Sequence, residues 1–188
     1  VKCRTGVDDN DDYEFLKSFI NIVKDSGVKT FIVHARKGIL KGLSPRQNRN
    51  IPPLNYQKVY SLKEDFPELE IIINGGIKTI SETKNHLNYV DGVMMGRAAY
   101  DDPFMLSNID FEVFSDTKIE ISRKDLLTEY LDYVHLMTSK GYDPKIMLKH
   151  VFGLKKGEKD AKRFRVKVAK IMNSSSLIEN KDELLSMV

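Results

Sequence analysis

Four short apolar runs, each ending in polar or glycine residues, constrain the fold of this chain more than any other feature. The runs are Val1 to Arg4, Thr30 to His34, Glu70 to Asn74 and Gly92 to Gly96. Short continuous apolar runs are typical of strands that are buried on both faces of a parallel sheet. Segments with helical spacing separate them, at Asp11 to Ser26, Tyr56 to Phe66 and Ser81 to Tyr89, the last with Ser81 as its N-cap. This alternation predicts an α/β fold, as a barrel or an open sheet with helical crossovers.

The number of strands limits how much of a barrel the chain holds. A closed eight-stranded (β/α)8 barrel takes about 250 residues, whereas this chain has 188 residues. If the fold is a TIM barrel, the four runs are its last four strands. The first residues also look like the inside of a strand, so we expect an N-terminal half to precede them.

The pattern changes from alternating to purely helical after Pro103. Apolar stripes predict helices at Arg123 to Lys140, Pro144 to Phe152 and Lys159 to Met172. These helices predict a small all-α domain, with a boundary near residues 115–122. We therefore expect two domains, the C-terminal part of a barrel at residues 1–118 and a helical domain at residues 119–188.

Charge is distributed unevenly along the chain. Lys and Arg minus Asp and Glu gives −1 for residues 1–119, +6 for residues 120–170 and −2 for residues 171–188. A neutral region followed by a basic one indicates a polyanionic partner for the basic region. A solvated helix face explains the same charges equally well.

Several classes of protein are disfavoured. No run approaches the roughly 20 apolar residues of a membrane span, and no signal segment opens the chain. The single cysteine, Cys3, cannot form an internal disulfide, which suits the cytoplasm; it is either a nucleophile or a strand residue. No residues have metal-ligand spacing, and neither a Walker motif nor a Ser-His-Asp arrangement is present.

Polar residues follow all four predicted strands, at the edge where parallel α/β folds place their sites. They are Lys2 and Arg4, His34 and Arg36, Asn74-Gly75-Gly76, and Gly96-Arg97. Glycines let a ligand approach the backbone, and arginine can hold phosphate through two hydrogen bonds. Each feature also has a structural explanation: a salt bridge for Lys2, a core position for His34, a turn for the glycines and a surface position for Arg97.

Six motifs in order resemble the tRNA-dihydrouridine synthase family, most closely its A-type subfamily. They are VKCRTGV at residues 1–7, FIVHARK at 31–37, GLSPRQNR at 42–49, IPPLNY at 51–56, INGGIK at 73–78 and DGVMMGRAAY at 91–100. The resemblance implies an FMN-binding TIM barrel followed by a helical tRNA-binding domain. It also implies an oxidoreductase of the CH–CH group that reduces uridines in tRNA with NADPH.

The resemblance assigns roles to individual residues. Contacts with FMN are implied for Lys2, His34, Asn74, Gly75, Gly76, Gly96 and Arg97. Contacts with tRNA are implied for Arg36, Arg46, Arg49, Lys162 and Arg165. The last two lie in Ala161-Lys-Arg-Phe-Arg165, where the family pattern has Arg in place of Lys162 and Trp in place of Phe164. Lysine keeps the charge but loses the planar fork, so this part of the match is weaker.

The family's proton-donating cysteine belongs to a motif that precedes these residues, and Cys3 does not match it. We therefore expect no catalytic residue and no activity in the 188 residues alone, and a monomer for the full-length protein. Three alternatives stay open: another FMN barrel such as a dihydroorotate dehydrogenase or an ene-reductase, a phosphate-binding barrel such as a sugar-phosphate isomerase, and a non-catalytic RNA-binding module.

Overall fold

The computed structural model describes residues 1–115, 117–172 and 181–188. Its residues form two compact units, Val1–Gly96 and Arg97–Val188. Each unit has its own hydrophobic core. The expected domain boundary at residues 118 and 119 falls within the second unit and stays a prediction.

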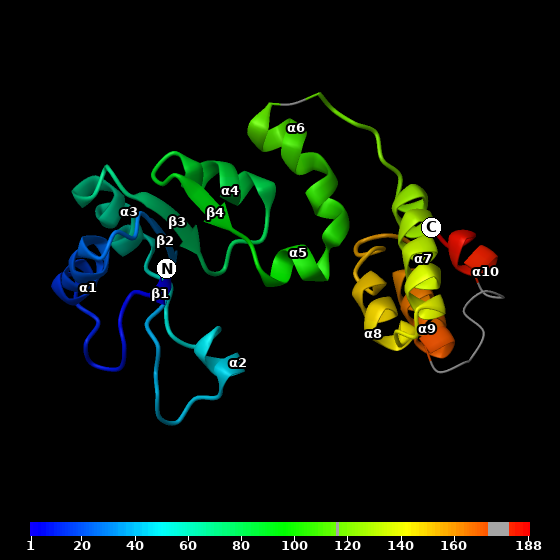
Figure 1. The fold of residues 1–188 in the computed structure, drawn as a ribbon, viewed down its shortest axis with the longest axis horizontal. Coiled ribbons are helices and arrows are strands. Elements are labelled where there is room, and N and C mark those ends of the chain that lie inside the picture. The colour runs from blue at the N-terminus through cyan, green and yellow to red at the C-terminus, as the bar shows by residue number, and fades with distance from the viewer. Residues whose placement is uncertain (116, 173–180) are drawn as a thin grey trace. The chain divides into compact units, whose positions relative to one another are not determined.

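The first unit is a four-stranded parallel sheet in the order β1-β2-β3-β4 (Figure 1). The strands are β1 (Lys2–Arg4), β2 (Thr30–His34), β3 (Glu70–Asn74) and β4 (Gly92–Met94), and the crossover helices are α1 (Tyr13–Asp25), α3 (Tyr56–Asp65) and α4 (Ile80–Leu87). The predicted alternation of strands and helices is confirmed, with β4 ending two residues earlier than expected. The unit is an α/β fold consistent with part of a TIM barrel.

Alternation along the strands divides the sheet into two faces. Phe31, Val33, Ile71 and Ile73 are completely buried and pack with α1 and α3. Each such side chain stabilises the fold by about 1.5–3 kcal/mol. The intervening residues Ile32 and Ile72 are only half-buried. They belong to the opposite face, which also carries the polar residues considered below.

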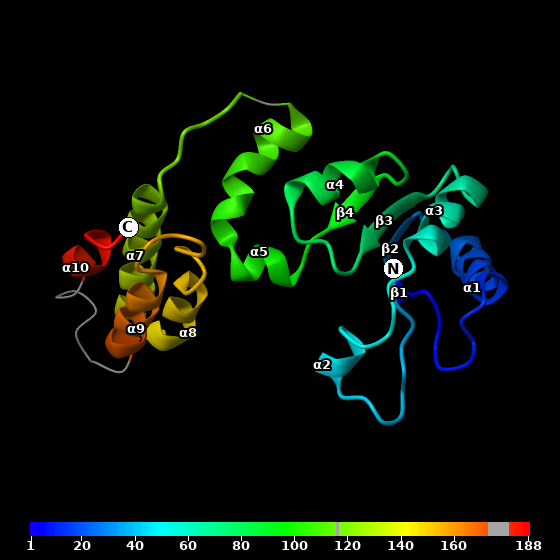
Figure 2. The ribbon, with the colours of Figure 1, turned by 180° about the vertical axis from the view of Figure 1, so that it is seen from behind.

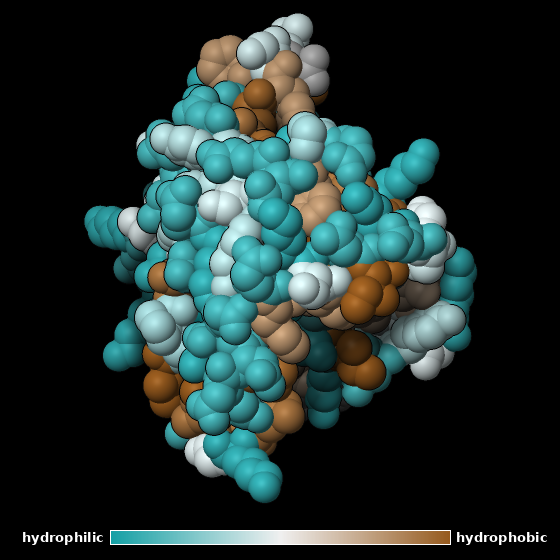
Figure 3. All heavy atoms as spheres, turned by 90° about the vertical axis from the view of Figure 1, so that its left-hand side faces the viewer, coloured by the Kyte–Doolittle hydropathy of each residue, from teal (hydrophilic) through white to brown (hydrophobic). Residues whose placement is uncertain are grey.

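The surface of α1 shows that its outer side is partly apolar. Figure 3 views the molecule from the side on which α1 lies in Figure 1, and it shows hydrophobic groups among mostly hydrophilic ones. Phe15, Phe19 and Ile22 of α1 are 41%, 37% and 73% exposed. This helix therefore buries one stripe, around Leu16 and Ile20, and leaves other apolar side chains accessible.

Helix α4 begins two residues earlier than Ser81 as N-cap would require, so that prediction is wrong. Thr79 is the N-cap: its hydroxyl accepts a hydrogen bond from the Glu82 amide at 3.1 Å, and the Glu82 carboxylate accepts one from the Thr79 amide at 3.1 Å. This capping box satisfies two amides at the helix start. Thr79 has the glutamate three residues later that Ser81 lacks.

The segment between β2 and α3 is long, but it is not entirely irregular. It contains the short helix α2 (Pro45–Asn48), for which Ser44 and Gln47 form a capping box. Asn48 fastens the segment internally, because its side chain accepts from the Ile39 amide and donates to the Ile39 carbonyl, both at 2.8 Å. The segment that carries α2 extends away from the sheet (Figures 1 and 2).

The second unit is helical. Its elements are α5 (Arg97–Asp101), η1 (Pro103–Asn108), α6 (Ile109–Phe114), α7 (Arg123–Ser139), α8 (Pro144–Leu148), η2 (Lys149–Val151), α9 (Ala161–Met172) and α10 (Lys181–Leu185). The three predicted helices are confirmed as α7, α8 with η2, and α9. The shorter elements α5, η1, α6 and α10 were not predicted. Leu127, Leu131, Phe164 and Val168 form the centre of the core. No helix in the described ranges has the length and apolar character to cross a membrane.

Candidate functional site

Strand register aligns three of the polar residues predicted at the carboxyl edge of the sheet. Arg4 lies opposite His34, and His34 lies opposite Asn74. Asn74 in turn pairs with Met94 on β4. The three side chains therefore belong to the same face of the sheet, because paired residues in neighbouring strands point the same way.

Lys2 is connected to this row, although it is the first residue of β1 and not the last. Its Nζ donates a hydrogen bond to Oδ1 of Asn74 at 3.3 Å, and Nδ2 of Asn74 donates to the Met94 carbonyl at 2.7 Å. Lys2 is exposed. Its partner is an amide and not a carboxylate, which leaves its positive charge unneutralised by that contact.

The Gly75-Gly76 turn follows β3 and lies against His34. Both residues have positive φ angles, +115° and +76°. A Cβ on Gly75 would be 2.7 Å from Cδ2 of His34, and a Cβ on Gly76 would be 2.6 Å from Cδ1 of Leu54. Glycine is therefore required twice over, by backbone conformation and by space. His34, which is 8% exposed, is one wall of this turn.

The second glycine motif differs from the first. Gly96 lies two residues after β4, is exposed, and would have open space around a Cβ. Packing within the first unit therefore does not require glycine at this position. Arg97 is the first residue of α5, in the second unit. Joint action of Arg97 with Asn74-Gly75-Gly76 stays a prediction.

Three arginines gather near the segment that carries α2. Nη1 of Arg4 donates to the carbonyls of Lys37 at 2.9 Å and Asn48 at 3.1 Å. Burial lowers the pKa of Arg4, and the neighbouring charges of Arg49 and Arg36 lower that pKa further. Arg36 donates through Nη1 to the Pro52 carbonyl, while its buried Nε has no hydrogen-bond partner in the part of the chain that the structure describes. The cluster is a concentration of positive charge suited to an anion.

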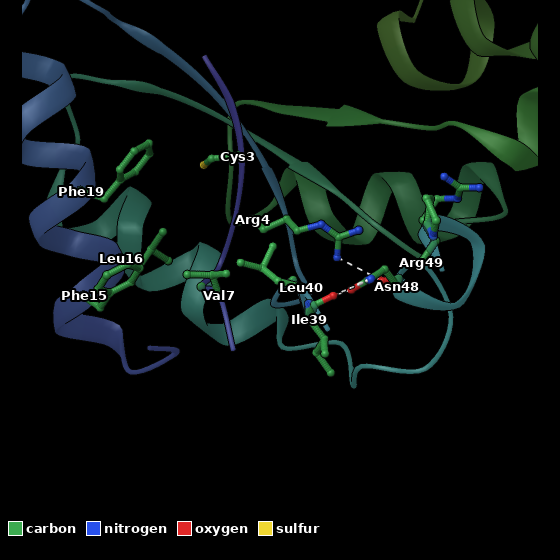
Figure 4. Close-up of a pocket in the computed structure, with 13 residues that line it drawn as sticks. Cys3, Arg4, Val7, Phe15, Leu16, Phe19, Ile39, Leu40, Asn48 and Arg49 are labelled. Atoms are coloured by element: carbon green, nitrogen blue, oxygen red, sulfur yellow. Dashed lines mark hydrogen bonds between the residues drawn. The ribbon is translucent and has the colours of Figure 1, made fainter. Parts of the chain in front are cut away.

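A cavity of about 570 Å³ lies beside β1, between α1 and the segment that carries α2 (Figure 4). Its lining is mostly apolar, with Phe15 and Phe19 on the side of α1 and Arg4 and Asn48 on the other. Cys3 also lines it, and burial raises the pKa of the Cys3 thiol to about 11, against the lowering effect of Lys2. The thiol is thus protonated at neutral pH and unsuited to act as a nucleophile.

Four of the five residues expected to contact tRNA lie in or at the end of two helices, and the fifth, Arg36, lies in the loop after β2. Arg46 lies within α2 and Arg49 is its C-cap, and both are exposed. Lys162 and Arg165 are exposed on α9, whereas Phe164 between them is completely buried in the helical core. Phenylalanine in place of the family's tryptophan therefore serves packing, and the cationic side chains on either side of it are accessible.

The sequence placed Arg4 at the carboxyl edge of the sheet without a specific contact, and it gave no role to Tyr56 or His86. The Tyr56 hydroxyl donates to the Gly75 carbonyl at 2.8 Å. The His86 ring meets the Tyr56 ring edge to face, with centroids 4.5 Å apart. The position of Arg4 at the end of a strand could be recognised in the sequence. Nothing in the sequence indicates the contact between Tyr56 of α3 and His86 of α4. Among the described residues no group of three His, Cys, Asp or Glu side chains could hold a metal ion.

Comparison with known proteins shows the family to which the chain belongs. The chain matches the family "Dihydrouridine synthase (Dus)" over residues 1–187. The tRNA-dihydrouridine(20/20a) synthase of Pasteurella multocida (strain Pm70) is 44% identical over 165 residues, which are 88% of this chain and 50% of that protein. The protein of the same name from Escherichia coli O6:H1 is 45% identical over 166 residues, with coverages of 88% and 50%. This chain spans about half the length of these curated relatives. With a family match along almost its whole length, the chain belongs to the dihydrouridine synthase family.

Proposed function

We propose that the chain is the C-terminal part of an A-type tRNA-dihydrouridine synthase. The complete protein would use FMN and NADPH to reduce uridines in the D-loop of tRNA to 5,6-dihydrouridine. The observation that carries the proposal is the meeting of Lys2, His34 and Asn74-Gly75-Gly76 at one edge of a parallel sheet. These are the residues for which the family resemblance implies contacts with the flavin.

The chemistry of these residues fits FMN. Lys2 is an exposed ammonium held by Asn74, and a cation beside N1 and C2=O of a flavin stabilises its anionic reduced form. His34 and the Gly75-Gly76 turn would bound the ribityl chain. Gly96 has open space beside its backbone, and the Arg97 guanidinium can form paired hydrogen bonds to phosphate. When bound, FMN would supply the hydride transfer from NADPH to the uracil ring.

The remaining residues of the proposal would hold tRNA. A stacked uracil cannot reach a flavin unless it leaves the stack, so the enzyme must grip the RNA on both sides of the target. Arg46 and Arg49 of the segment that carries α2, together with Arg36, would contact one part of the tRNA. Lys162 and Arg165 on α9 would contact another. Most such contacts are to phosphate groups. They fix the position of the RNA on the protein and do not distinguish one base sequence from another.

Other parts of the proposal follow from the family resemblance. The residues at 1–118 would complete a TIM barrel together with an N-terminal half, and residues 119–188 would be the tRNA-binding domain. The cysteine that protonates C5 of uracil would lie in that N-terminal half, so the 188 residues alone would not be active. We propose that the full protein is a cytoplasmic monomer.

The test uses the complete gene product that contains this sequence. Wild type is compared with the Lys2→Ala/Arg97→Ala double variant and with a Lys29→Ala/Lys58→Ala control, in which two lysines at other sites are removed. Bound FMN is measured by absorbance, and dihydrouridine formed in unmodified tRNA is measured with NADPH as reductant. Wild type and control are expected to hold FMN and form product, and the double variant to lose both.

The other outcomes separate the parts of the proposal. Product in the wild type together with full flavin content in the double variant would keep the function and reject Lys2 and Arg97 as flavin ligands. A wild-type protein that binds tRNA but neither binds flavin nor forms dihydrouridine would reject the enzyme in favour of an RNA-binding module.

A further inference from the structure

Tyr56 is the first residue of α3 and touches the Gly75-Gly76 turn directly. Its hydroxyl donates to the Gly75 carbonyl at 2.8 Å. The same hydroxyl oxygen would lie 3.0 Å from a Cβ placed on Gly76. The Tyr56 hydroxyl therefore lies against both glycines. The turn that they form begins directly after the last residue of β3.

The backbone fixes Tyr56 relative to the sheet. The amide of Asn55 donates to the Ala35 carbonyl at 2.8 Å, and the amide of Ala35 donates to the Asn74 carbonyl at 2.8 Å. Asn55 also caps α3, because its side chain accepts from the Lys58 amide at 3.2 Å. The start of α3 and the end of β3 are thus joined through the end of β2, and Tyr56 projects from this fixed point.

The Tyr56 ring belongs to a cluster of aromatic side chains from α3, from α4 and from Tyr89, which follows α4. The His86 ring of α4 meets it edge to face, with centroids 4.5 Å apart. Nδ1 of His86 is 2.7 Å from the Tyr60 hydroxyl, and the Tyr60 ring stacks on Tyr89 with centroids 4.5 Å apart. His86 is only 7% exposed. The Tyr56 ring is therefore fixed by packing as well as by its hydroxyl.

The Tyr56 hydroxyl stays a donor under ordinary conditions. Burial raises its pKa, and the nearby charge of Glu82 raises that pKa further, against the lowering effect of Arg36. A protonated phenol can donate to a carbonyl, whereas a phenolate cannot. The Tyr56 hydroxyl is thus protonated at neutral pH and can donate to Gly75.

We propose that Tyr56 is a positioning residue that fixes the Gly75-Gly76 turn in the conformation required by the flavin's ribityl phosphate. Two adjacent glycines with positive φ would otherwise sample many conformations, because glycine has the greatest backbone freedom. A ligand that needs one of these conformations binds more weakly when the turn is unfastened. The identity of the ligand rests on the proposed function. The contact between Tyr56 and Gly75 is independent of that function.

The experiment compares Tyr56→Phe with Tyr13→Phe in the complete gene product. Tyr13 is a matched control, because its hydroxyl also donates at 2.7 Å within the first unit, to Asp65, on α3 and away from the glycines. Two quantities are measured: the ¹⁵N order parameters of the Gly75 and Gly76 amides without flavin, and the dissociation constants of FMN and riboflavin. Thermal unfolding of both variants provides the correction for any general loss of stability.

Tyr56→Phe is expected to lower the glycine order parameters from about 0.85 to below about 0.6. It is also expected to weaken FMN binding about five- to tenfold, as for the loss of one hydrogen bond, with a smaller effect on riboflavin. Tyr13→Phe should leave the glycine order parameters at about 0.85 and should change the FMN dissociation constant by no more than about twofold. Unchanged order parameters in Tyr56→Phe, or equal losses of FMN affinity in the two variants, would overturn the proposal.

The proposed function can fail separately. If the wild-type protein does not bind FMN while Tyr56→Phe still loosens the turn, the positioning role stands and the flavin assignment is rejected. If FMN binds to the wild type and the turn is loosened without loss of affinity, Tyr56 is a structural residue only, and the positioning role is rejected.

Discussion

The two units of the chain fix their functional side chains in different ways. In the first unit, side chains hold loop backbone: Arg4 donates to Lys37 and Asn48 carbonyls, and Tyr56 donates to Gly75. In the second unit side chains also donate to backbone carbonyls, Arg123 to Leu154 and Tyr130 to Met147, both at 2.9 Å, but neither contact involves the candidate RNA residues Lys162 and Arg165. Arg123 pairs with Glu158 at 3.2 Å, and Lys167 pairs with Glu183.

The difference teaches which kind of change each unit tolerates. The candidate flavin residues follow strands, so their positions depend on strand register and on loops fastened by hydrogen bonds to carbonyls. The candidate RNA residues on α9 depend only on which helix face is buried, and Phe164 decides that. Exposed ion pairs contribute little, typically up to about 1 kcal/mol each. A point change should therefore disturb the first unit's site through its loops, and the second unit's face only through its core.

The largest effects are expected from paired core substitutions, Phe31→Ala and Phe164→Ala. Both phenylalanines are completely buried, one in each core. Each substitution should destabilise its own unit by about 3–5 kcal/mol, because it removes buried apolar surface and leaves a cavity. Denaturant unfolding measures the total loss, and native-state hydrogen exchange shows which amides lose protection.

The amides that lose protection from hydrogen exchange show whether the two cores unfold independently or as one. Phe31→Ala should reduce protection in β2 and β3 and leave α7 and α9 unchanged, with the opposite pattern for Phe164→Ala. Tyr133→Ala is a suitable control, because that residue is 48% exposed and its loss should cost less than about 1 kcal/mol. Equal loss of protection in both units for either variant would mean that the two cores are not separate.

Much of the first unit could be predicted, because the topology of a parallel sheet determines which residues lie at its carboxyl edge. Apolar runs gave the strands, and the parallel arrangement placed His34 and Asn74 at one edge. Lys2 was harder, since a three-residue strand shows little alternation and its position within the strand is ambiguous. The N-cap of α4 was predicted two residues late, although Glu82 follows Thr79 at the spacing of a capping box.

Contacts between helices could not be predicted in the same way. Tyr56 and His86 are 30 positions apart in the sequence, and nothing in the periodicity of α3 or α4 indicates that their rings meet. The partners of Arg4 and Arg36 are loop carbonyls, and carbonyls carry no sequence signature. Phe164 illustrates a further limit: the family comparison noted a departure from tryptophan, but only the packed core shows that an apolar ring suffices there.

An intermediate effect is expected from a matched pair of glycine substitutions, Gly75→Ala and Gly141→Ala. Both glycines have positive φ, +115° and +90°, but a Cβ on Gly75 would clash with His34 while one on Gly141 would meet open space. Gly141→Ala should therefore cost roughly 1–2 kcal/mol, from conformation alone. Gly75→Ala should cost roughly 2–5 kcal/mol in total, because crowding adds about 1–3 kcal/mol.

Denaturant midpoints of the two glycine variants measure this difference. The same experiment sharpens the comparison of the units, since only the Gly75 change should also weaken FMN binding. Equal destabilisation by the two substitutions would show that the His34 ring can move aside at little cost, and that the turn is less constrained than the contacts indicate.

The smallest effect is a pH dependence confined to the first unit. The two histidines that are buried among the described residues, His34 and His86, both lie there. Burial lowers the pKa of His86 below its ordinary value of 6.5, and the charge of Glu82 opposes that lowering. The unfolded state then binds more protons than the folded state as pH falls through 6.5. Stability from His86 is thus complete above pH 6.5 and declines towards lower pH.

His86→Gln isolates this contribution, because glutamine can either donate a hydrogen bond to the Tyr60 hydroxyl or accept one from it, but does not titrate. Between pH 6.5 and 5, the wild type should lose stability faster than the variant, by at most about 1.4 kcal/mol per pH unit. The window excludes Asp65 and Glu82, whose lowered pKa values affect stability only below their ordinary values of 3.8 and 4.5. Hydrogen exchange should place the difference in α3 and α4. A parallel pH response of wild type and variant would mean that His86 has the same pKa in the folded and unfolded states, and the buried packing of His86 against Tyr56 and Tyr60 would then be rejected.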